Sequence, residues 1–351
     1  MAMPELLSDI SVVEIAGELN GYTGRLLADL GATVTLVDMG GDALPPYEEL
    51  FLHHDKPRSS RPQIPELLRG ADVVLLSGGA DAPDDAAVHP DAIRAVAPRA
   101  IVAVLTPFGL DGPCADYVST DLVRLAAGGL LWLGGYPDAE PVAPYGQQST
   151  TATGIFGAVA IMLALIERDT TGLGCVIEVS SQEVLTQALE TALPEYELTG
   201  KVRGRVGGEP REAGTGIYPC QNGYVSMVAG RLGTAAAWTR LREWLVEQGT
   251  PGADELFTNG WEDLGFRQRP ESIARFSEIF GAFTATRTKS ELYVEAQRRS
   301  IALAPVNAPT DVLRDEQLNA RGFFRNGVLA PPYRITEGAP VLDTTLTPTP
   351  T

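Results

Sequence analysis

The sequence predicts an α/β fold with a doubly wound parallel sheet, followed by a second, α+β domain. Two β-rich runs, Ile10–Ile15 and Thr33–Asp38, flank Gly21–Leu30, whose leucines have helical spacing, so the three segments form a β-α-β unit. After Leu198 the composition changes toward glycine and charged residues, which predicts a domain boundary. The chain has 351 residues, a length that accommodates about two domains.

The rest of the first domain continues the alternation of strands and helices. Gly40–Pro65 is polar and contains prolines, and we expect it to be a solvated connection. Beyond it the pattern predicts a strand, a helix, a strand, a helix and, later, another strand: Asp72–Leu76, Asp91–Val96, Ala100–Leu105, Thr120–Ala127 and Cys175–Val179. In a sheet of this kind ligands bind at the carboxyl ends of the strands.

A long helix within Gly146–Gly174 is the most conspicuous element of the chain. Its side chains from Ala152 to Ile166 are almost all apolar, which predicts a helix buried on every side and shorter than the about 20 residues of a membrane span. Hydroxyl side chains at its start are expected to cap the first turn, where an anion is favoured: Ser149, Thr150, Thr151 and Thr153. We therefore expect the active site at this helix entrance.

The second domain is predicted from a shorter set of elements. Thr199–Gly216 is expected to be a linker, and Tyr224–Val228 a strand. The expected helices are Ala235–Glu247, Pro270–Ala282 and Lys289–Arg299. The proline- and threonine-rich segment Ala330–Thr351 is expected to be an extended tail that packs on the first domain.

The net charge of -18 and the pI of about 4.6 argue against nucleic acid or an anionic membrane as partner. An anionic ligand then needs local cations, and Lys56, Arg58 and Arg61 are the cluster that fits phosphate recognition. The first residues carry no basic, signal-like segment, so we expect a cytoplasmic protein.

The cysteines and histidines have no metal-ligand spacing, so no metal site is expected. The first turn carries Gly17, Gly21 and Gly24, and Asp38 closes the second strand, which is compatible with dinucleotide binding. The glycine spacing departs from the G-x-G-x-x-G fingerprint. The alternative is that these glycines permit close packing of the helix on the sheet.

Several segments, in the same order as in the family, resemble the family III CoA-transferases, which include carnitine CoA-transferase, bile-acid-induced proteins and α-methylacyl-CoA racemases. Together they cover nearly the whole chain: GYTGRLLADLGATVTLVD, TPFGLDGP, GGYPDAEPV, GIFGAVAIMLALIERDTTGLG, GIYPCQNGYVSMVAG, LAPVN and DEQLNARGFF.

The resemblance implies a Rossmann-like large domain, residues 1–200 completed by 325–351, and a small α+β domain with linkers, residues 201–324. It also implies an interlocked dimer and coenzyme A or an acyl-CoA thioester as substrate or ligand, with no tightly bound cofactor. In the transferases an aspartate attacks the thioester, whereas in the racemases that aspartate and a histidine move the α-proton.

The position of that aspartate, four residues before the glycine that matches Gly154, is occupied by Thr150. Thr120 occupies the position of the racemase histidine, and Asp121 keeps the acidic neighbour. The resemblance thus indicates a divergent member with a degenerate active site, because a threonine hydroxyl without a base is a weak nucleophile.

The expected CoA-binding residues also depart from the family. Asp38 and Met39 replace a glutamate and an arginine, and Ser77-Gly78-Gly79 replace an Asn-Phe-Arg. The residues left to contact CoA are Gly21, Lys56, Arg58, Ser77 and Gly78, which predicts weakened or altered binding because charge-assisted hydrogen bonds are lost.

Two functions follow as hypotheses. The first is an acyl-CoA enzyme, a transferase or a racemase-like or redirected chemistry, in which Glu18 and Asp121 are acid–base groups and Ser149 and Thr150 donate to the thioester. The second is a non-catalytic subunit of a heteromeric CoA-transferase, paired with a competent homologue. A homodimer remains the alternative assembly.

Overall fold

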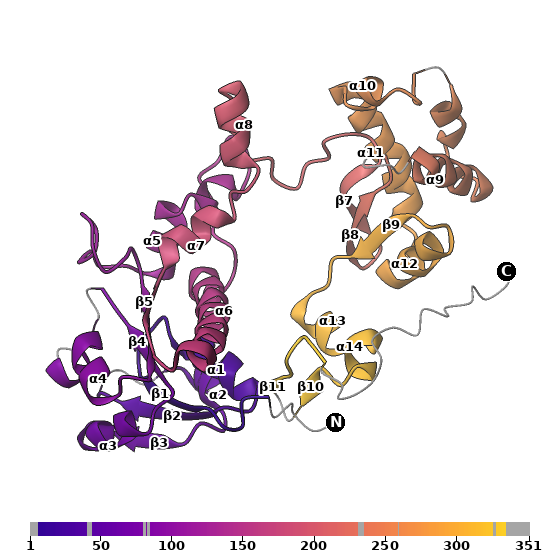
Figure 1. The fold of residues 1–351 in the computed structure, drawn as a ribbon. Helices are drawn as coiled ribbons and strands as arrows, with labels where there is room; N and C mark the ends of the chain where they lie inside the picture. The colour runs from indigo at the N-terminus through magenta and orange to yellow at the C-terminus, as the bar shows by residue number, and fades with distance from the viewer. Residues whose placement is uncertain are drawn as a thin grey trace. The chain divides into compact units, whose positions relative to one another are not determined.

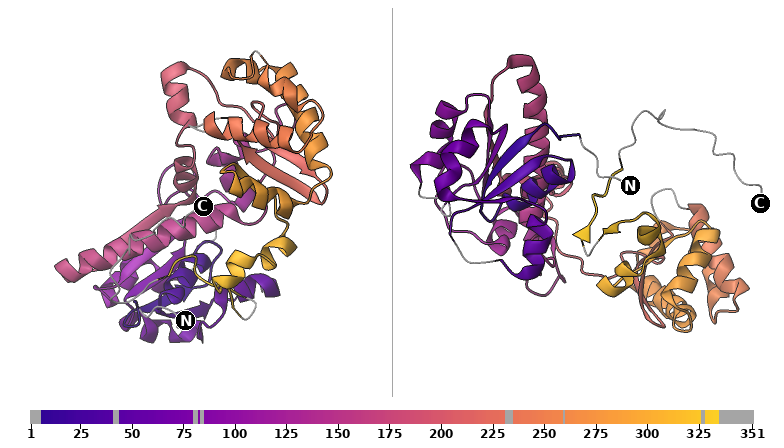
Figure 2. Two further views of the ribbon diagram at one scale, coloured as in Figure 1. Left: turned by 90° about the vertical axis from the view of Figure 1, so that its right-hand side faces the viewer. Right: turned by 90° about the horizontal axis from the view of Figure 1, so that it is seen from below.

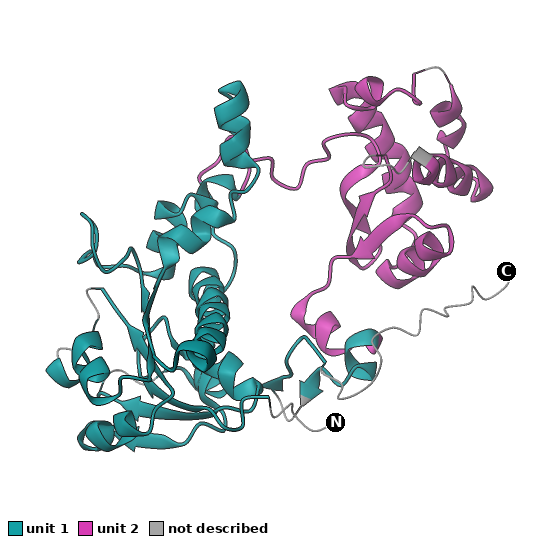
Figure 3. Ribbon diagram, viewed as in Figure 1, with its two compact units in different colours: residues 1–134, 141–204, 317–351 teal, residues 135–140, 205–316 magenta. Residues whose placement is uncertain are grey.

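The computed structural model describes residues 6–40, 44–79, 82, 85–230, 235–258, 260–325 and 328–334. The chain forms two compact units (Figure 3). Unit 1 comprises residues 1–134, 141–204 and 317–351, and unit 2 comprises residues 135–140 and 205–316. The units therefore divide after 204 and 316, compared with 200 and 324 in the sequence-based division.

Unit 1 is built on a six-stranded sheet in the order β3-β2-β1-β4-β5-β6, with every neighbouring pair parallel (Figure 1). The predicted parallel α/β sheet is confirmed, and each predicted strand lies within one residue of its observed bounds. The strands are β1 (Ser11–Ile15), β2 (Thr33–Asp38), β3 (Arg58–Ser60), β4 (Val73–Ser77), β5 (Ile101–Thr106) and β6 (Val176–Ser180). The strand order reverses between β1 and β4, which is where such sheets bind ligands.

Helices cover both faces of this sheet (Figure 2). Because side chains alternate along a strand, Val12 and Leu75 pack beneath α1 (Gly21–Asp29) and α6 (Gln148–Thr171). Val13 and Val74 pack on the other face, beneath α3 (Ile64–Arg69) and α4 (Pro90–Val96). Strands β4 and β5 are buried along their whole length, as expected for the middle of a doubly wound sheet.

The segment between Gly40 and Pro65 differs from the expected solvated connection. It forms α2 (Pro46–His53), the edge strand β3 and a 3₁₀ turn η1 (Arg61–Gln63). Residues 41–43 lie outside the described part. Strand β3 has the polar sequence Arg-Ser-Ser and only three residues, so no hydrophobic alternation marks it in the sequence.

Unit 1 also contains short helices, 3₁₀ turns and a hairpin that lie outside the six-stranded sheet. They are η2 (Ala86–Val88), α5 (Asp121–Ala127), η3 (Leu130–Leu133), α7 (Ser181–Gln187), α8 (Ala192–Thr199), the hairpin β10 (Phe324–Arg325) and β11 (Val328–Leu329), and α14 (Glu316–Ala320), which begins at the unit boundary. Arg25 on α1 donates to the carbonyl of Leu329 at 2.6 Å, which ties the C-terminal segment to the first helix. Most of the predicted tail, Ala330–Thr351, lies outside the described residues.

Unit 2 contains an antiparallel sheet in the order β7-β8-β9. Its elements are β7 (Thr215–Cys220), β8 (Gly223–Val228), α9 (Ala235–Glu247), η4 (Ala253–Phe257), α10 (Leu264–Arg267), α11 (Pro270–Thr284), α12 (Lys289–Arg298), β9 (Ala302–Pro305) and α13 (Pro309–Leu313). Its core is aromatic and includes Trp238, Trp244, Phe276, Phe280 and Phe283.

Candidate active site

The entrance of α6 is a buried polar cluster rather than a capped helix end. The helix begins at Gln148, and its N-cap residue Gln147 makes no side-chain cap, so the prediction that the hydroxyls cap the helix is wrong. Ser149, Thr150 and Thr153 lie inside the first turns and are buried. Ser149 and Thr150 instead bond to side chains of neighbouring segments, because those segments pack tightly on the helix start.

Two glycines bring α6 close to α1 and so fix the entrance beside the turn after β1. A Cβ at Gly154 would lie 3.0 Å from Tyr22, and one at Gly157 would lie 2.8 Å from the hydroxyl of Thr23. That hydroxyl donates to the carbonyl of Gly154 at 3.1 Å. Only glycine permits this approach.

The outer face of α6 corrects the prediction of a helix buried on every side. Ile155, Val159, Leu163 and Ile166 recur at helical spacing and are 45–65% exposed, while Ile161 and Leu165 pack on the sheet. Among the described residues, α6 is the one helix long and apolar enough to cross a membrane, with mean hydropathy 1.9 over a window that is 44% buried. The expectation that it is too short is therefore wrong. Core helices share this length and composition, and α6 packs on β5, β6 and α1 as a core helix does.

Arg124 on α5 is the centre of the cluster and is fully buried. Its Nε donates to Ser149 Oγ at 2.9 Å and its Nη1 to Ser119 Oγ at 2.9 Å. Its Nη2 donates both to Thr150 Oγ1 at 3.0 Å and to Glu18 Oε1 at 2.6 Å. The guanidinium therefore binds three neutral hydroxyls and one carboxylate.

Asp121 also bonds to Ser149, whereas its neighbour Thr120 bonds within α5. Asp121 Oδ1 accepts from Ser149 N at 2.8 Å and from Ser149 Oγ at 2.6 Å, so its carboxylate fixes the start of α6. Thr120, and not Asp121, caps α5 by accepting from Val123 N at 3.4 Å. Thr120 is exposed, and no hydrogen bond joins it to Thr150 in the described part of the chain.

Glu18 approaches from the turn after β1, and its side chain is 42% exposed. It is the partly accessible carboxylate of the cluster, on the same nitrogen of Arg124 that holds Thr150. The structure therefore brings together Glu18, Asp121, Ser149 and Thr150, four of the residues predicted to act at the entrance.

Lys56 does not lie on an open surface. Its ammonium group is 2.7 Å from Glu14 Oε2 on β1 and donates to the carbonyl of Gly21 at 3.1 Å, while its side chain is 1% exposed. His53 Nδ1 lies 3.6 Å from Glu14 Oε1. Burial raises the pKa of Glu14 to about 7 although Lys56 opposes the shift, and burial with the nearby Lys56 lowers the pKa of His53 to about 4. This group supports the turn at Gly21 from beneath.

Arg58 and Arg61 remain accessible, in contrast to Lys56. Their side chains are 52% and 56% exposed, and each pairs with a carboxylate, Glu49 for Arg58 and Asp85 for Arg61. Exposed pairs of this kind exchange partners at little cost, so both arginines are available to an incoming phosphate.

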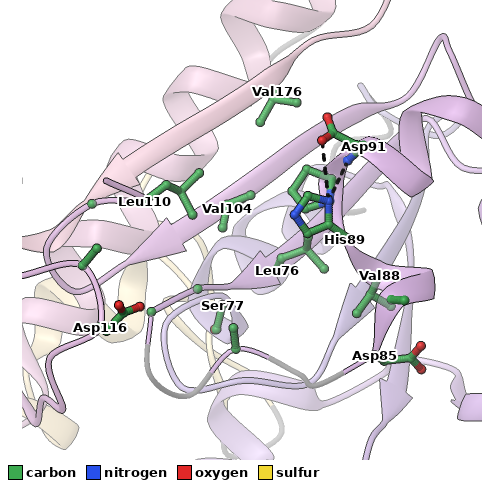
Figure 4. A pocket seen from close by; sticks show the side chains of 17 residues that line it. Leu76, Ser77, Asp85, Val88, His89, Asp91, Val104, Leu110, Asp116 and Val176 are labelled. Atoms are coloured by element: carbon green, nitrogen blue, oxygen red, sulfur yellow. Dashed lines mark hydrogen bonds and ion pairs between the residues drawn. The ribbon is translucent and has the colours of Figure 1, made fainter. Parts of the chain in front are cut away.

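Ser77, the last residue of β4, and Gly78 line a pocket of about 680 Å³ at the carboxyl ends of β4 and β5 (Figure 4). Leu76, Val104 and Leu110 form its apolar wall, and its lining also includes His89 and three carboxylates, Asp85, Asp91 and Asp116. Among the described residues that line the pocket there is no lysine or arginine, so it suits an uncharged group better than a phosphate. Ser77 Oγ accepts from Leu19 N at 3.1 Å, which joins the pocket to the turn after β1.

The glycines of the first turn are explained by packing. A Cβ at Gly24 would lie 1.7 Å from Glu14 Oε2, and one at Gly17 would lie 2.4 Å from Ser77 Oγ. A Cβ at Gly21 would lie 3.3 Å from His53. In the described part of the chain no group of three metal-ligating side chains is found.

Arg124 is the residue of the cluster that sequence reasoning missed. It lies three residues after Asp121 on α5, so both side chains reach α6. A cation within the apolar run Leu122–Leu125, on the same helix face as a candidate acid, is the signal that would have identified it.

The fold and this cluster define an α/β protein with a polar helix entrance beside the point where the strand order reverses. The sequence profile of CoA-transferase family III matches residues 7–349. Succinyl-CoA:(R)-benzylsuccinate CoA-transferase subunit BbsE of Thauera aromatica is 29% identical over 347 residues, covering 92% of this chain and 84% of its own. The alpha subunit of succinyl-CoA–L-malate CoA-transferase of Chloroflexus aurantiacus is 24% identical, covering 91% and 78%.

Among solved structures, a CAIB/BAIF family protein from Brucella suis superposes with a TM-score of 0.82 at 25% identity, covering 94% of this chain and 93% of that one. The chain belongs to CoA-transferase family III. The resemblance seen in the sequence is confirmed, and the family implies CoA thioesters as substrates.

Proposed function

We propose that this chain is a subunit of a CoA-transferase that binds acyl-CoA thioesters and relies on a homologous partner for the nucleophilic carboxylate. The observation that best supports this proposal is the hydrogen bonding of Thr150, the residue that we align with the family aspartate. Its hydroxyl accepts a hydrogen bond from the buried Arg124. Asp121 on α5 supplies a carboxylate at the helix start, but this carboxylate already accepts hydrogen bonds from the backbone N–H and the hydroxyl of Ser149. The first turn of α6 thus offers hydroxyls where the transfer reaction needs a carboxylate.

The names of relatives support a heteromeric assembly. BbsE is named as a subunit, and succinyl-CoA–L-malate CoA-transferase has alpha and beta subunits that both resemble this chain. In such an assembly one competent chain supplies the chemistry, and the other supplies binding surface. We expect the assembly to be cytoplasmic and to hold no tightly bound cofactor.

The apolar face of α6 supports a dimer. Ile155, Val159, Leu163 and Ile166 form an exposed stripe, which a second chain of the same fold would cover. We propose an interlocked heterodimer, with the homodimer as the other outcome. Analytical ultracentrifugation of this chain alone and with its partner distinguishes the two.

We place CoA along the carboxyl edge of the sheet of unit 1. The exposed Arg58 and Arg61 would bind its phosphates, and Gly21, Ser77 and Gly78 would contact the rest. Lys56 is left out because its ammonium group is buried against Glu14. The acidic pocket after β4 would accept an uncharged part of the ligand.

The test compares the purified chain, alone and combined with a homologue that carries aspartate at the position of Thr150. We expect CoA binding by calorimetry for this chain, no acyl transfer by this chain alone, and transfer by the mixture. Transfer by this chain alone contradicts the proposal, and an absence of CoA binding removes CoA as its ligand.

A second candidate is self-sufficient acyl-CoA chemistry, transferase or racemase-like, at the same cluster. It is favoured by one observation, the partly exposed carboxylate of Glu18 on the nitrogen of Arg124 that also binds Thr150. Glu18 and Asp121 would be its acid–base groups, with Thr120, Ser149 and Thr150 as hydroxyls of the site. This candidate predicts that Glu18→Gln removes any turnover by this chain alone, whereas Glu66→Gln, on the surface of α3, does not.

A further inference from the structure

Arg124 has an unusual charge balance for a fully buried residue. Its guanidinium bonds to Ser119, Ser149 and Thr150, which are neutral, and its one carboxylate partner is Glu18, whose side chain is 42% exposed. A buried cation is stable when it is paired and fully hydrogen-bonded, and here a single carboxylate supplies the countercharge.

We propose that Arg124 and position 150 are a coupled pair, in which Arg124 is a positioning residue that would hold any carboxylate at position 150 as a buried ion pair. The proposal rests on the function proposed above. Its consequence is that Thr150→Asp alone does not restore a nucleophile, because the residue at position 124 must change as well.

The geometry supports capture of a carboxylate. Nη2 of Arg124 lies 3.0 Å from Thr150 Oγ1, which is the distance of a direct hydrogen bond, and Thr150 is 3% exposed. An aspartate side chain starts from the same Cβ and carries its two oxygens one bond further out, which extends them toward the guanidinium that Thr150 already contacts. Position 150 is also the third residue of α6, where the helix dipole favours a negative charge.

Capture lowers reactivity at this position. A carboxylate that accepts from a buried guanidinium is stabilised in its ionised form and its pKa falls, so its lone pairs are less available to a thioester carbonyl. Nη2 of Arg124 carries two N–H groups, so the guanidinium can hold a carboxylate at position 150 and Glu18 at the same time.

Formation of a covalent CoA adduct shows whether Arg124 has bound the carboxylate at position 150 or has left it free to react. A free carboxylate at position 150 attacks the thioester carbonyl, the C–S bond breaks, and CoA thiolate leaves a mixed anhydride. The thiolate then attacks the carbonyl carbon of the protein side chain, the substrate carboxylate leaves, and a CoA thioester remains on the protein. Intact mass spectrometry detects that thioester, and hydroxylamine removes it.

The experiment combines Thr150→Asp with Arg124→Gln and measures melting temperature and CoA adduct. We expect Thr150→Asp to fold and to melt near the temperature of the unmodified chain. Arg124→Gln is expected to lower the melting temperature of the Thr150→Asp chain by about 5–10 °C more than it lowers that of the unmodified chain. Thr151→Asp is the matched control, because Thr151 is one residue away and is not among the hydrogen-bond partners of Arg124, and it is expected to show no such difference. Incubation with acyl-CoA is expected to give at least about tenfold more adduct on the double variant than on Thr150→Asp alone.

Equal destabilisation by Arg124→Gln in all backgrounds overturns the proposal, and so does an adduct on Thr150→Asp as abundant as on the double variant. A Thr150→Asp chain that does not fold also contradicts it, since Arg124 is proposed to accommodate the charge. If Arg124→Gln unfolds, Arg124→Met repeats the cycle with a side chain of similar volume. The melting measurements need no CoA, so they decide this proposal even where CoA binding, and with it the proposed function, fails.

Discussion

Replacing Lys56 by methionine separates a structural cation from a phosphate-binding one. The ammonium group lies 2.7 Å from Glu14 Oε2, and both side chains are at most 1% exposed. Lys56→Met keeps the aliphatic volume and leaves Glu14 without its cation. Breaking a buried ion pair from one side costs about 3–5 kcal/mol, because the remaining charge is desolvated and unpaired. For a domain of this size that corresponds to a loss of about 6–20 °C in melting temperature.

The loss depends on pH, and its sign follows from Glu14. Burial raises the pKa of Glu14 from 4.5 to about 7, so the stability that this group contributes is fully present below pH 4.5 and is lost as pH rises through 7. At pH 8.5 Glu14 is ionised and needs Lys56. At pH 5.5 Glu14 is protonated and needs no countercharge, so the effect of Lys56→Met is expected to be small.

His53 acts in the opposite direction, and Lys56→Met removes one of the two causes of its pKa shift. Its pKa is lowered from 6.5 to about 4, so the stability it contributes is present above pH 6.5 and is lost as pH falls through 4. The comparison of variant with unmodified chain is therefore made at each pH separately.

Thermal unfolding of both proteins at pH 5.5 and 8.5 provides the measurement, with Arg58→Met as the control. Arg58 is on the exposed side of β3, and we expect its loss to change stability by less than about 0.5 kcal/mol. CoA binding by both variants is measured by calorimetry, because Arg58→Met is expected to weaken CoA binding without lowering stability. A Lys56→Met chain that is as stable as the unmodified one at pH 8.5 and that binds CoA less tightly would refute the structural role of Lys56.

Three further predictions concern packing and assembly. Gly24→Ala is expected to overpack the core and to destabilise the protein by about 1–3 kcal/mol, because the added Cβ would lie 1.7 Å from Glu14 Oε2; thermal unfolding measures the loss. Gly70→Ala is the control, because the nearest atom to its Cβ is 3.9 Å away, and it is expected to be tolerated. Phe280→Ala is expected to destabilise unit 2 by about 3–5 kcal/mol, because Phe280 is fully buried against Tyr218, Phe276 and Phe283, and a loss below about 1 kcal/mol in denaturant titration would contradict this core. Leu163→Lys on the exposed stripe of α6 is expected to shift the sedimenting species toward the monomer while the fold, followed by circular dichroism, stays unchanged; an unaltered dimer would exclude that face as the interface.

Most of the parallel sheet was predictable because its strands carry long apolar runs. Val73–Leu76 and Ile101–Leu105 are buried on both faces, so burial leaves a clear signal in the sequence. Strand β3 left none, since its pairing with β2 is made by backbone groups and its side chains are polar. The length of α6 was underestimated because its polar first turns look like a cap in the sequence, and its outer face was misjudged because an apolar side chain does not reveal whether another chain covers it.

The site was predictable in its location but not in its bonding. The hydroxyls at Ser149 and Thr150 and the acids at Glu18 and Asp121 were recognised from their place in the pattern. Arg124 was missed because its partners come from three separate segments, and no spacing along the chain encodes them. Lys56 was assigned to a phosphate because the sequence shows its charge and not its burial, whereas its partner Glu14 lies 42 residues away.

The covalent intermediate shows directly which chain of the complex supplies the nucleophile. The two-chain complex, formed with a homologue that carries aspartate at the position of Thr150, is incubated with an acyl-CoA, and each chain is weighed by intact mass spectrometry. We expect a hydroxylamine-sensitive CoA thioester on the partner and none on this chain. A CoA thioester on this chain, at Glu18 or any other residue, would contradict this expectation.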